Sequence, residues 1–254
     1  MELREAIDSI WESTKQGIYF PSEWKGKLTF EEGYQVQLGL LTRNTQEGEI
    51  QAGWKVGLTS KAIQNQLDFH ERVMGFLLES MNKPSGNLFV FDELVSPCFE
   101  TELCVTLGAD LKGPGVSQSQ ARAAFSHVAP AFELIERRGN FTADMALSMA
   151  DNVQAKYFVT GEALALAKNE DLRKSFVKVV INGEVVDEAS GKEVMGGPSA
   201  SVAWLANRLA DFGRKLEAGT RVMTGSLTRQ YPIGQGDYVE ADFEEYGRVV
   251  MEFE

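Results

Sequence analysis

Amphipathic helices dominate the hydrophobic pattern at the start of the chain. Residues 3–15 place their apolar side chains on one helical stripe, and a capping-box pattern begins a second helix at Thr29. A third, short helix is expected after Ser60, and residues 53–59 read as a strand that ends in a loop. We therefore predict a helical N-terminal segment over residues 1–70.

Strand patterns and turn residues fill most of the remaining chain. Residues 177–186 have the pattern of a hairpin, because an Asn-Gly pair between two apolar runs suits a type I′ turn. Residues 198–212 predict one amphipathic helix, and residues 220–253 predict three further strands. We expect residues 71–254 to form a strand-rich region that is continuous with the helical segment, in one domain of the α+β class.

The stretch 97–106 carries two acidic residues within a strand pattern. With a period of two, Glu100 and Glu102 share a face with Cys98 and Cys104, while the opposite face suits a hydrophobic core. Cysteine is more often buried than exposed, which argues that this face is not simply solvated. Two buried carboxylates side by side stay ionised only if a cation or a hydrogen-bonded partner lies between them.

A third carboxylate, Glu133, lies in a similarly apolar stretch at residues 129–136. Three oxygen ligands that leave positions for water are a typical arrangement around Mg²⁺ or Mn²⁺. The alternative is that Glu100 and Glu102 belong to the solvated face of an antiparallel strand, which is a common pattern. The spacing of the residues leaves both interpretations open.

Composition and charge narrow the classes of partner. The hydrophobic content of 43% is ordinary for a globular protein. The formal net charge of −12 argues against binding to nucleic acid or to an anionic membrane surface, because Lys and Arg cluster only at Arg137-Arg138. The sequence has no basic region followed by an apolar run at its start and no apolar stretch of the ~20 residues that span a membrane, so we expect a cytoplasmic protein.

The sequence also argues against three common kinds of site. His70 and His127 are the only histidines, and no Gly-x-Ser-x-Gly pattern accompanies either, which disfavours a serine hydrolase. The two cysteines lack Cys-x-x-Cys spacing, and at ~3.3 Å per residue they lie too far apart along one strand for a disulfide. Gly-x-Gly-x-x-Gly is absent, which removes the simplest nicotinamide site. Carboxylate chemistry around a hard metal ion remains.

Lys55 is the most notable single cation. It lies in a glycine-flanked strand pattern, where burial beside a metal ion would place it to exchange protons. The alternative is an ordinary lysine whose ammonium group reaches solvent or pairs with a glutamate.

A set of motifs in a fixed order resembles one known family. The chain is similar to the 2-hydroxypenta-2,4-dienoate (2-keto-4-pentenoate) hydratase and 4-oxalocrotonate decarboxylase branch of the fumarylacetoacetate hydrolase superfamily. Each motif alone is weak, but the ordered set is specific. The motifs lie at residues 53–61, 100–102, 113–116, 130–135, 150–152, 197–207 and 225–228.

This resemblance implies a mostly β fumarylacetoacetate-hydrolase-like fold and a metal-dependent lyase of aromatic catabolism. It implies that Mg²⁺ or Mn²⁺ chelates the carboxylate and 2-oxygen of a short dienoate. Lys55 matches the family lysine that handles protons beside the metal. The implied metal ligands are Glu100, Glu102 and Glu133, and the implied substrate-binding residues are Gly225, Ser226, Leu227 and Thr228.

The chain departs from this family pattern at two places. The branch usually has a Pro-Asp pair where this sequence has Arg72-Val73, so a carboxylate implicated in handling water is missing. The adjacent His70-Glu71 pair is a candidate replacement, although a surface loop is the plainer interpretation. A serine of the second motif is also missing, and we expect Gln154 to donate a hydrogen bond to the substrate in its place.

Hydration of a small 2-hydroxydienoate or 2-oxoenoate is the leading predicted reaction. The missing aspartate motivates the alternative of decarboxylating a 4-oxalocrotonate-like 2-oxo-enedioate or a β-keto acid. A C–C bond hydrolase and a non-catalytic partner subunit are further alternatives. We expect a small 2-oxo or 2-hydroxy acid as substrate, a homo-oligomer, and possible association with a partner enzyme of the same pathway.

Overall fold

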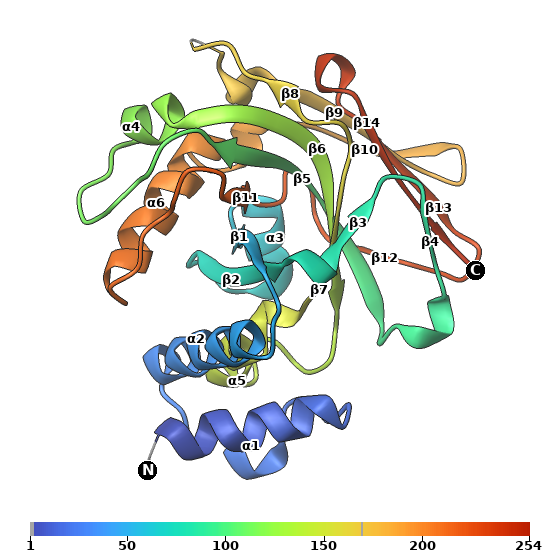
Figure 1. Ribbon diagram of the computed structural model, residues 1–254. Helices are drawn as coiled ribbons and strands as arrows, with labels where there is room; N and C mark the ends of the chain where they lie inside the picture. Colours follow the sequence, from blue (N-terminus) through green and yellow to red (C-terminus); the bar gives the residue numbers. More distant parts are fainter. Residues whose placement is uncertain (1–2, 169) are drawn as a thin grey trace.

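The protein folds as two β-sheets with helices at their edges (Figure 1). The computed structural model describes residues 3–168 and 170–254. The α-helices are α1 (Leu3–Lys15), α2 (Phe30–Gln46), α3 (Lys61–Leu67), α4 (Gln118–Ala123), α5 (Met145–Ala150) and α6 (Pro198–Ala210). The strands are β1 (Gln51–Gly57), β2 (Val73–Leu78), β3 (Asn82–Pro84), β4 (Asn87–Phe89), β5 (Pro97–Leu107), β6 (Phe125–Glu136), β7 (Ala155–Thr160), β8 (Leu164–Ala165), β9 (Phe176–Ile181), β10 (Glu184–Ser190), β11 (Arg221–Met223), β12 (Tyr231–Pro232), β13 (Tyr238–Asp242) and β14 (Arg248–Phe253).

The larger sheet has the strand order β2-β1-β11-β5-β6-β7-β3, with β12 paired to β5 and β8 paired to β6. Its centre is the long antiparallel pair of β5 and β6. Strand alternation sends Leu103 of β5 and Phe132 and Leu134 of β6 into the main hydrophobic core. The acidic side chains of β5 therefore lie on the other face, together with Cys104.

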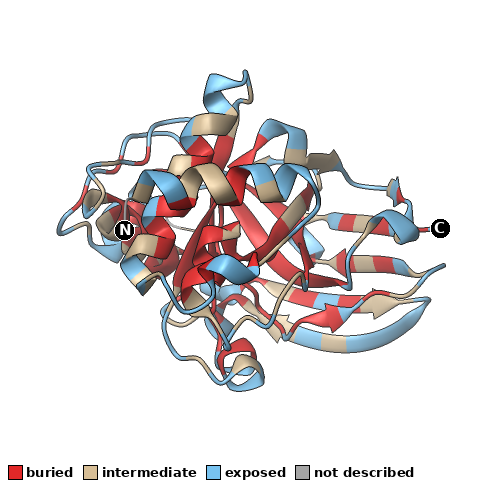
Figure 2. Ribbon diagram, turned by 90° about the horizontal axis from the view of Figure 1, so that it is seen from below, coloured by how far each residue is buried: buried red, intermediate tan, exposed pale blue. Residues whose placement is uncertain are grey.

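The smaller sheet has the order β10-β9-β13-β14-β4 and contains the hairpin predicted at residues 177–186. Figure 2 shows that buried residues are concentrated in the central strands, whereas the helices bury one face and expose the other. The buried residues therefore form a core between the sheets and the helices that cover them.

Helices α1, α2 and α5 pack together on one side of the molecule (Figure 1). Trp11 of α1 and Leu40 of α2 belong to one apolar cluster with Leu147 of α5. The capping box that predicted the start of α2 is formed, because the Thr29 hydroxyl accepts a hydrogen bond from the backbone of Glu32. Helix α5 leads directly into the turn that precedes β7, so this helical layer fixes one wall of the site described below.

The α+β class is confirmed, and the helices expected from the pattern are present. One detail differs at the C-terminal end, where four strands rather than three lie between residues 220 and 254, because β12 is only two residues long. Strand β1, which lies within residues 1–70, pairs with β2 and β11 inside the larger sheet. This pairing joins the helical segment to the strand-rich region, as expected for one continuous domain. The boundary at residue 70 itself stays a prediction.

Two further expectations concern the described residues as a whole. Cys98 and Cys104 are both buried free thiols. None of the described helices is long and apolar enough to cross a membrane.

Candidate active site

Three buried glutamates meet on one face of the β5–β6 pair. Glu100 of β5 lies directly opposite Glu133 of β6 in the antiparallel register, and Glu102 is two residues along the same face of β5. Each of the three offers a carboxylate oxygen, and these oxygens all lie within 4.8 Å of one another. Glu102 and Glu133 are fully buried, with 0% of each residue exposed. The site is therefore internal and not the solvated face of an edge strand.

The hydrogen bonds around these glutamates leave at least one oxygen of each for a further partner. Gln230 Nε2 donates to Glu100 Oε1 at 2.6 Å, and the Gly225 backbone N–H donates to Glu102 Oε2 at 2.7 Å. Among the described residues, Glu100 Oε2, Glu102 Oε1 and both oxygens of Glu133 have no hydrogen-bond partner. Unpaired buried carboxylate oxygens are strongly disfavoured, and a hard divalent cation satisfies them. The donor set therefore fits Mg²⁺ or Mn²⁺.

Lys55 supplies the positive charge closest to these carboxylates. Its Nζ lies 3.1 Å from Glu133 Oε1 and donates to the Val153 carbonyl at 3.4 Å, and its side chain is only 3% exposed. One ammonium group does not neutralise three carboxylates. Burial, followed by repulsion from Glu133, raises the pKa of Glu100 to about 7 and the pKa of Glu102 well above its usual range. A divalent ion would remove this electrostatic penalty.

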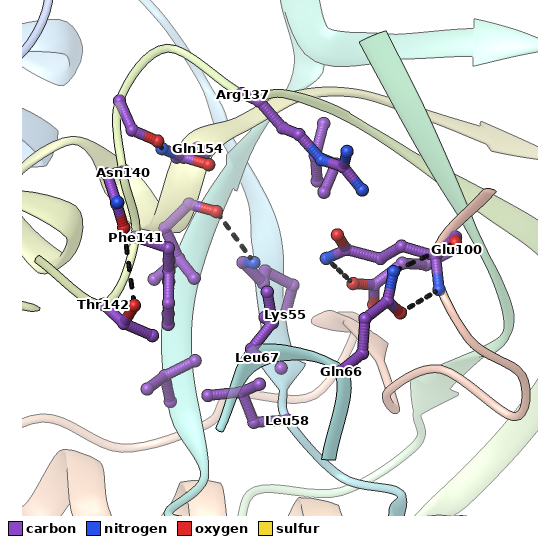
Figure 3. Close-up of a pocket in the computed structure, with 16 residues that line it drawn as sticks. Lys55, Leu58, Gln66, Leu67, Glu100, Arg137, Asn140, Phe141, Thr142 and Gln154 are labelled. Carbon is purple, nitrogen blue, oxygen red and sulfur yellow. Dashed lines mark hydrogen bonds between the residues drawn. The ribbon is translucent and has the colours of Figure 1, made fainter. Parts of the chain in front are cut away.

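A cavity of about 260 Å³ opens beside Lys55 and Glu100 (Figure 3). One part of its lining is apolar and includes Leu58 and Ile135, whereas Gln154 contributes an amide. A cavity with an apolar wall, a few polar groups and buried ionisable residues is the usual form of a small-molecule site.

The turn between α5 and β7 carries part of the cavity wall in a strained conformation. Asn152, Val153 and Gln154 have φ values of 53°, 54° and 60°, which side chains with a Cβ rarely adopt. The Asn152 side chain holds this turn against β2, because it accepts from the Phe76 N–H at 2.8 Å and donates to the Phe76 carbonyl at 2.9 Å. In this conformation, the Val153 carbonyl accepts a hydrogen bond from Lys55.

Comparison with known proteins decides the family. Residues 68–254 match the family described as fumarylacetoacetate (FAA) hydrolase C-terminal. The chain belongs to the fumarylacetoacetate hydrolase family. The family resemblance read from the ordered motifs is thereby confirmed.

Relatives of this family member include both predicted kinds of lyase. A 4-oxalocrotonate decarboxylase of Pseudomonas putida is 35% identical over 228 residues, which cover 89% of this chain and 86% of the relative. A 2-hydroxyhexa-2,4-dienoate hydratase of Comamonas testosteroni is 33% identical over 230 residues, which cover 89% of this chain and 87% of the relative. The prediction of a metal-dependent lyase of this family is confirmed at that level.

A solved structure of a relative matches the whole fold. The 4-oxalocrotonate decarboxylase of Pseudomonas putida G7, complexed with magnesium and adipate, superposes with a TM-score of 0.92 at 32% identity. The match covers 100% of this chain and 99% of that chain. The divalent metal bound by that relative agrees with the donor set formed here by the three glutamates.

The motif at residues 225–228 forms hydrogen bonds with β5, the strand that carries Glu100 and Glu102. Gly225 binds Glu102 through its backbone, the Leu227 N–H donates to the Thr101 carbonyl at 2.9 Å, and the Ser226 hydroxyl bonds to Thr228 within the loop. None of these four residues is among the described residues that line the cavity. Their binding of substrate stays a prediction, whereas their support of the carboxylates is direct.

His70 and Glu71 lie away from the cavity. Both are exposed in the loop between α3 and β2, and His70 Nε2 lies 4.0 Å from Asp68 Oδ1. They border a different surface hollow, whereas Val73, where the family resemblance implies an aspartate, lines the cavity itself. A catalytic role for His70 and Glu71 stays a prediction that this arrangement does not favour.

Gln154 lies in the cavity wall as expected, but its amide already donates to the Gly139 carbonyl at 2.9 Å. Two further cavity residues, Gln230 and Arg137, were not predicted as site residues from the sequence. No periodic pattern marks Gln230, because its contact with Glu100 depends on a loop returning from far along the chain. Arg137 had a usable signal, since the alternation of β6, extended by one residue, places it on the same face as Glu133.

Proposed function

We propose that this protein is a divalent-metal-dependent lyase that releases carbon dioxide from a small 2-oxo-enedioate. The observation that carries this proposal is the acid content of the cavity. Among the described lining residues, Glu100 is the only carboxylate, and Val73 occupies the position at which the family usually has an aspartate. Addition of water needs a group that activates it, whereas decarboxylation needs none.

The chain's own residues suit this reaction. When bound by Glu100, Glu102 and Glu133, a divalent ion supplies positive charge to the carboxylate and 2-oxygen of the substrate. As the bond to the distal carboxylate breaks, its electron pair moves along the conjugated chain toward the 2-oxygen. The Lys55 ammonium group lies beside Glu133 and stabilises negative charge at that end of the cavity. Gln230 fixes the orientation of Glu100.

Hydration of a 2-hydroxydienoate is the second candidate. Relatives that are 33% and 34% identical to this chain are named 2-hydroxyhexa-2,4-dienoate hydratase and 2-hydroxypent-2,4-dienoate hydratase, which favours the same reaction here. In that case a polar cavity residue such as Gln154 would have to orient the water.

Turnover of two substrates separates these candidates. The purified protein is incubated with Mg²⁺ and either 4-oxalocrotonate or 2-hydroxypenta-2,4-dienoate, and the products are identified by mass. Loss of carbon dioxide from 4-oxalocrotonate supports the proposal, and gain of one water by the dienoate supports hydration. If neither substrate is converted, both candidate reactions are contradicted. C–C bond hydrolysis and a non-catalytic partner subunit are then the remaining alternatives.

We also infer the setting of the enzyme from its family. A small 2-oxo or 2-hydroxy acid as substrate, a homo-oligomeric state, a cytoplasmic location and association with a pathway partner enzyme remain proposals. Size-exclusion chromatography with light scattering, alone and with a purified candidate partner, tests the assembly.

A further inference from the structure

The cavity face of β6 continues beyond the metal-binding glutamates to an arginine. Alternation along β6 places Glu133 and Ile135 on one face, Arg137 directly follows the strand, and Ile135 and Arg137 line the cavity. At ~3.3 Å per residue, the Cα of Arg137 lies ~13 Å along the strand from the Cα of Glu133. The Arg137 N–H donates to the Ser96 carbonyl at 3.3 Å, which keeps the backbone paired beside β5. The backbone of Arg137 is therefore held beside β5, and its exposed side chain lies at the mouth of the cavity.

The two adjacent arginines have different environments. Arg138 points to the other face, where its guanidinium lies 3.1 Å from Glu136 Oε2 and 2.9 Å from Asp151 Oδ2. Arg137 has no carboxylate within 4.0 Å among the described residues, and Figure 3 shows its guanidinium extending toward the side of the cavity that holds Glu100. Arg138 is thus neutralised by the protein, whereas Arg137 keeps its charge for a ligand.

The charges of the cavity residues indicate what kind of ligand group Arg137 would bind. The other lining cation, Lys55, already pairs with Glu133. In a chain with a net charge of −12, a guanidinium without a carboxylate partner at a cavity mouth favours an anionic ligand group. Ile135, which lies between the two charged ends, provides an apolar surface for the carbon chain of such a ligand.

We propose that Arg137 is a specificity-determining residue that binds the distal carboxylate of a dicarboxylate substrate. The proposal rests on the proposed function only in placing the 2-oxo acid end of the substrate at the three glutamates. It makes the cavity selective for a molecule with an anionic group at both ends. Because carbon dioxide is neutral, the contact is lost as the distal carboxylate leaves, so Arg137 contributes to substrate binding rather than to the chemical step.

Binding of two matched ligands tests the proposal without turnover. Isothermal titration measures the affinity of the Mg²⁺-loaded protein for 2-oxoadipate and for 2-oxohexanoate, which differ only in the distal carboxylate. We expect Arg137→Gln to weaken 2-oxoadipate binding about 10- to 100-fold, the loss typical of a charge-assisted hydrogen-bonded pair, and to leave 2-oxohexanoate unchanged. Arg137→Lys should retain part of the preference. The control is Arg4→Gln, at an exposed side chain of α1, which should change neither affinity.

Two results would overturn the assignment. One is equal binding of both ligands by the unmodified protein, and the other is an equal loss for both ligands in Arg137→Gln with its thermal midpoint unchanged. If the enzyme turns over 4-oxalocrotonate, the same variant should raise KM without lowering kcat, because the contact weakens as carbon dioxide forms. If the protein discriminates the ligands through Arg137 but turns over neither tested substrate, the proposed lyase function fails and the Arg137 assignment stands.

Discussion

Glu102 shows at the scale of one residue why the carboxylate cluster is suited to a metal ion. One of its oxygens accepts the Gly225 N–H, and the other has no partner among the described residues. We expect Glu102→Gln to weaken Mg²⁺ binding roughly a hundredfold or more, because even supporting residues of metal sites contribute ~10- to 100-fold. Titration calorimetry with Mg²⁺ measures this loss directly.

The control for this change is Glu252→Gln on β14, where the side chain is exposed. It has the same chemistry and should leave Mg²⁺ affinity unaltered. Unchanged Mg²⁺ affinity in Glu102→Gln would show that the ion, if bound at all, does not use this carboxylate.

Lys55 is the buried cation of the site, and its removal separates chemistry from metal binding. Lys55→Met takes away the group that lies 3.1 Å from Glu133 Oε1. We expect turnover to fall roughly 10²- to 10³-fold, the range for one group that stabilises charge in the transition state, while Mg²⁺ still binds because the carboxylates remain. Steady-state kinetics and Mg²⁺ titration are measured on the same preparation. The exposed Lys61→Met is the matched control, and near-normal turnover in Lys55→Met would contradict the assigned role.

At the scale of elements, the loop that carries Gly225 must approach the loop between β1 and α3 very closely. Gly225 has a φ of +105°, and a Cβ there would lie 1.9 Å from Thr59 Oγ1. We expect Gly225→Ala to lower both thermal stability and Mg²⁺ affinity, because the loop must move and release Glu102. Thermal melts with and without Mg²⁺ report both effects.

Gly86→Ala is the matched control for this loop. Gly86 also has a positive φ, of +83°, but nothing lies within 4 Å of the added Cβ, so the control contains the backbone strain without the collision. Equal losses in the two variants would show that strain alone explains the result and that the close approach to Thr59 is unimportant.

The turn between α5 and β7 predicts a pH dependence of stability. Burial raises the pKa of Asp151 from 3.8 to about 6, although the Arg138 guanidinium acts in the opposite direction. Since the folded pKa is above the unfolded one, this carboxyl stabilises the fold most below pH 3.8, and the contribution is lost as pH rises through about 6. Asp151→Asn cannot ionise, so its thermal midpoint should rise relative to the unmodified protein between these two pH values.

Circular dichroism melts across this pH range measure the difference between the two proteins. Asp68→Asn, at a fully exposed side chain, is the control and should follow the unmodified protein at every pH. A constant difference between Asp151→Asn and the unmodified protein would mean that Asp151 has the same pKa in the folded and unfolded states.

The sequence predicts local elements of this site well because their signals are local. Strand alternation alone places Glu100 and Glu102 on one face, and a capping box marks the start of α2. The approach of Glu133 to Glu100 depends instead on the β5–β6 register, and the contact from Gln230 depends on a loop that returns to β5. Such long-range contacts leave no periodic pattern. The family motifs identify Glu133 as a metal ligand, but no motif includes Gln230.

At the scale of the whole molecule, strand order decides which distant segments form the cavity. Strand β1, which carries Lys55, pairs with β2 and with β11 near the end of the chain. Neither pairing follows from hydrophobic pattern, since any of several strands would satisfy the same alternation. This is why the sequence identifies Lys55 as a notable cation but cannot place it beside Glu133 without the family resemblance.

A metal ion held between β5 and β6 should stabilise the whole fold and not only the site. Binding to the folded state alone adds about 2.7 kcal/mol when free Mg²⁺ is a hundredfold above its Kd, and the ion also removes the repulsion among the three glutamates. We expect Mg²⁺ to raise the thermal midpoint in a concentration-dependent manner, and a chelator to reverse the shift. In Glu102→Gln the response should be much smaller, because one ligand is lost. If Mg²⁺ does not change the thermal midpoint of the unmodified protein, the carboxylate cluster does not hold this ion. The same melts repeated with Mn²⁺ would then decide between a different metal and none.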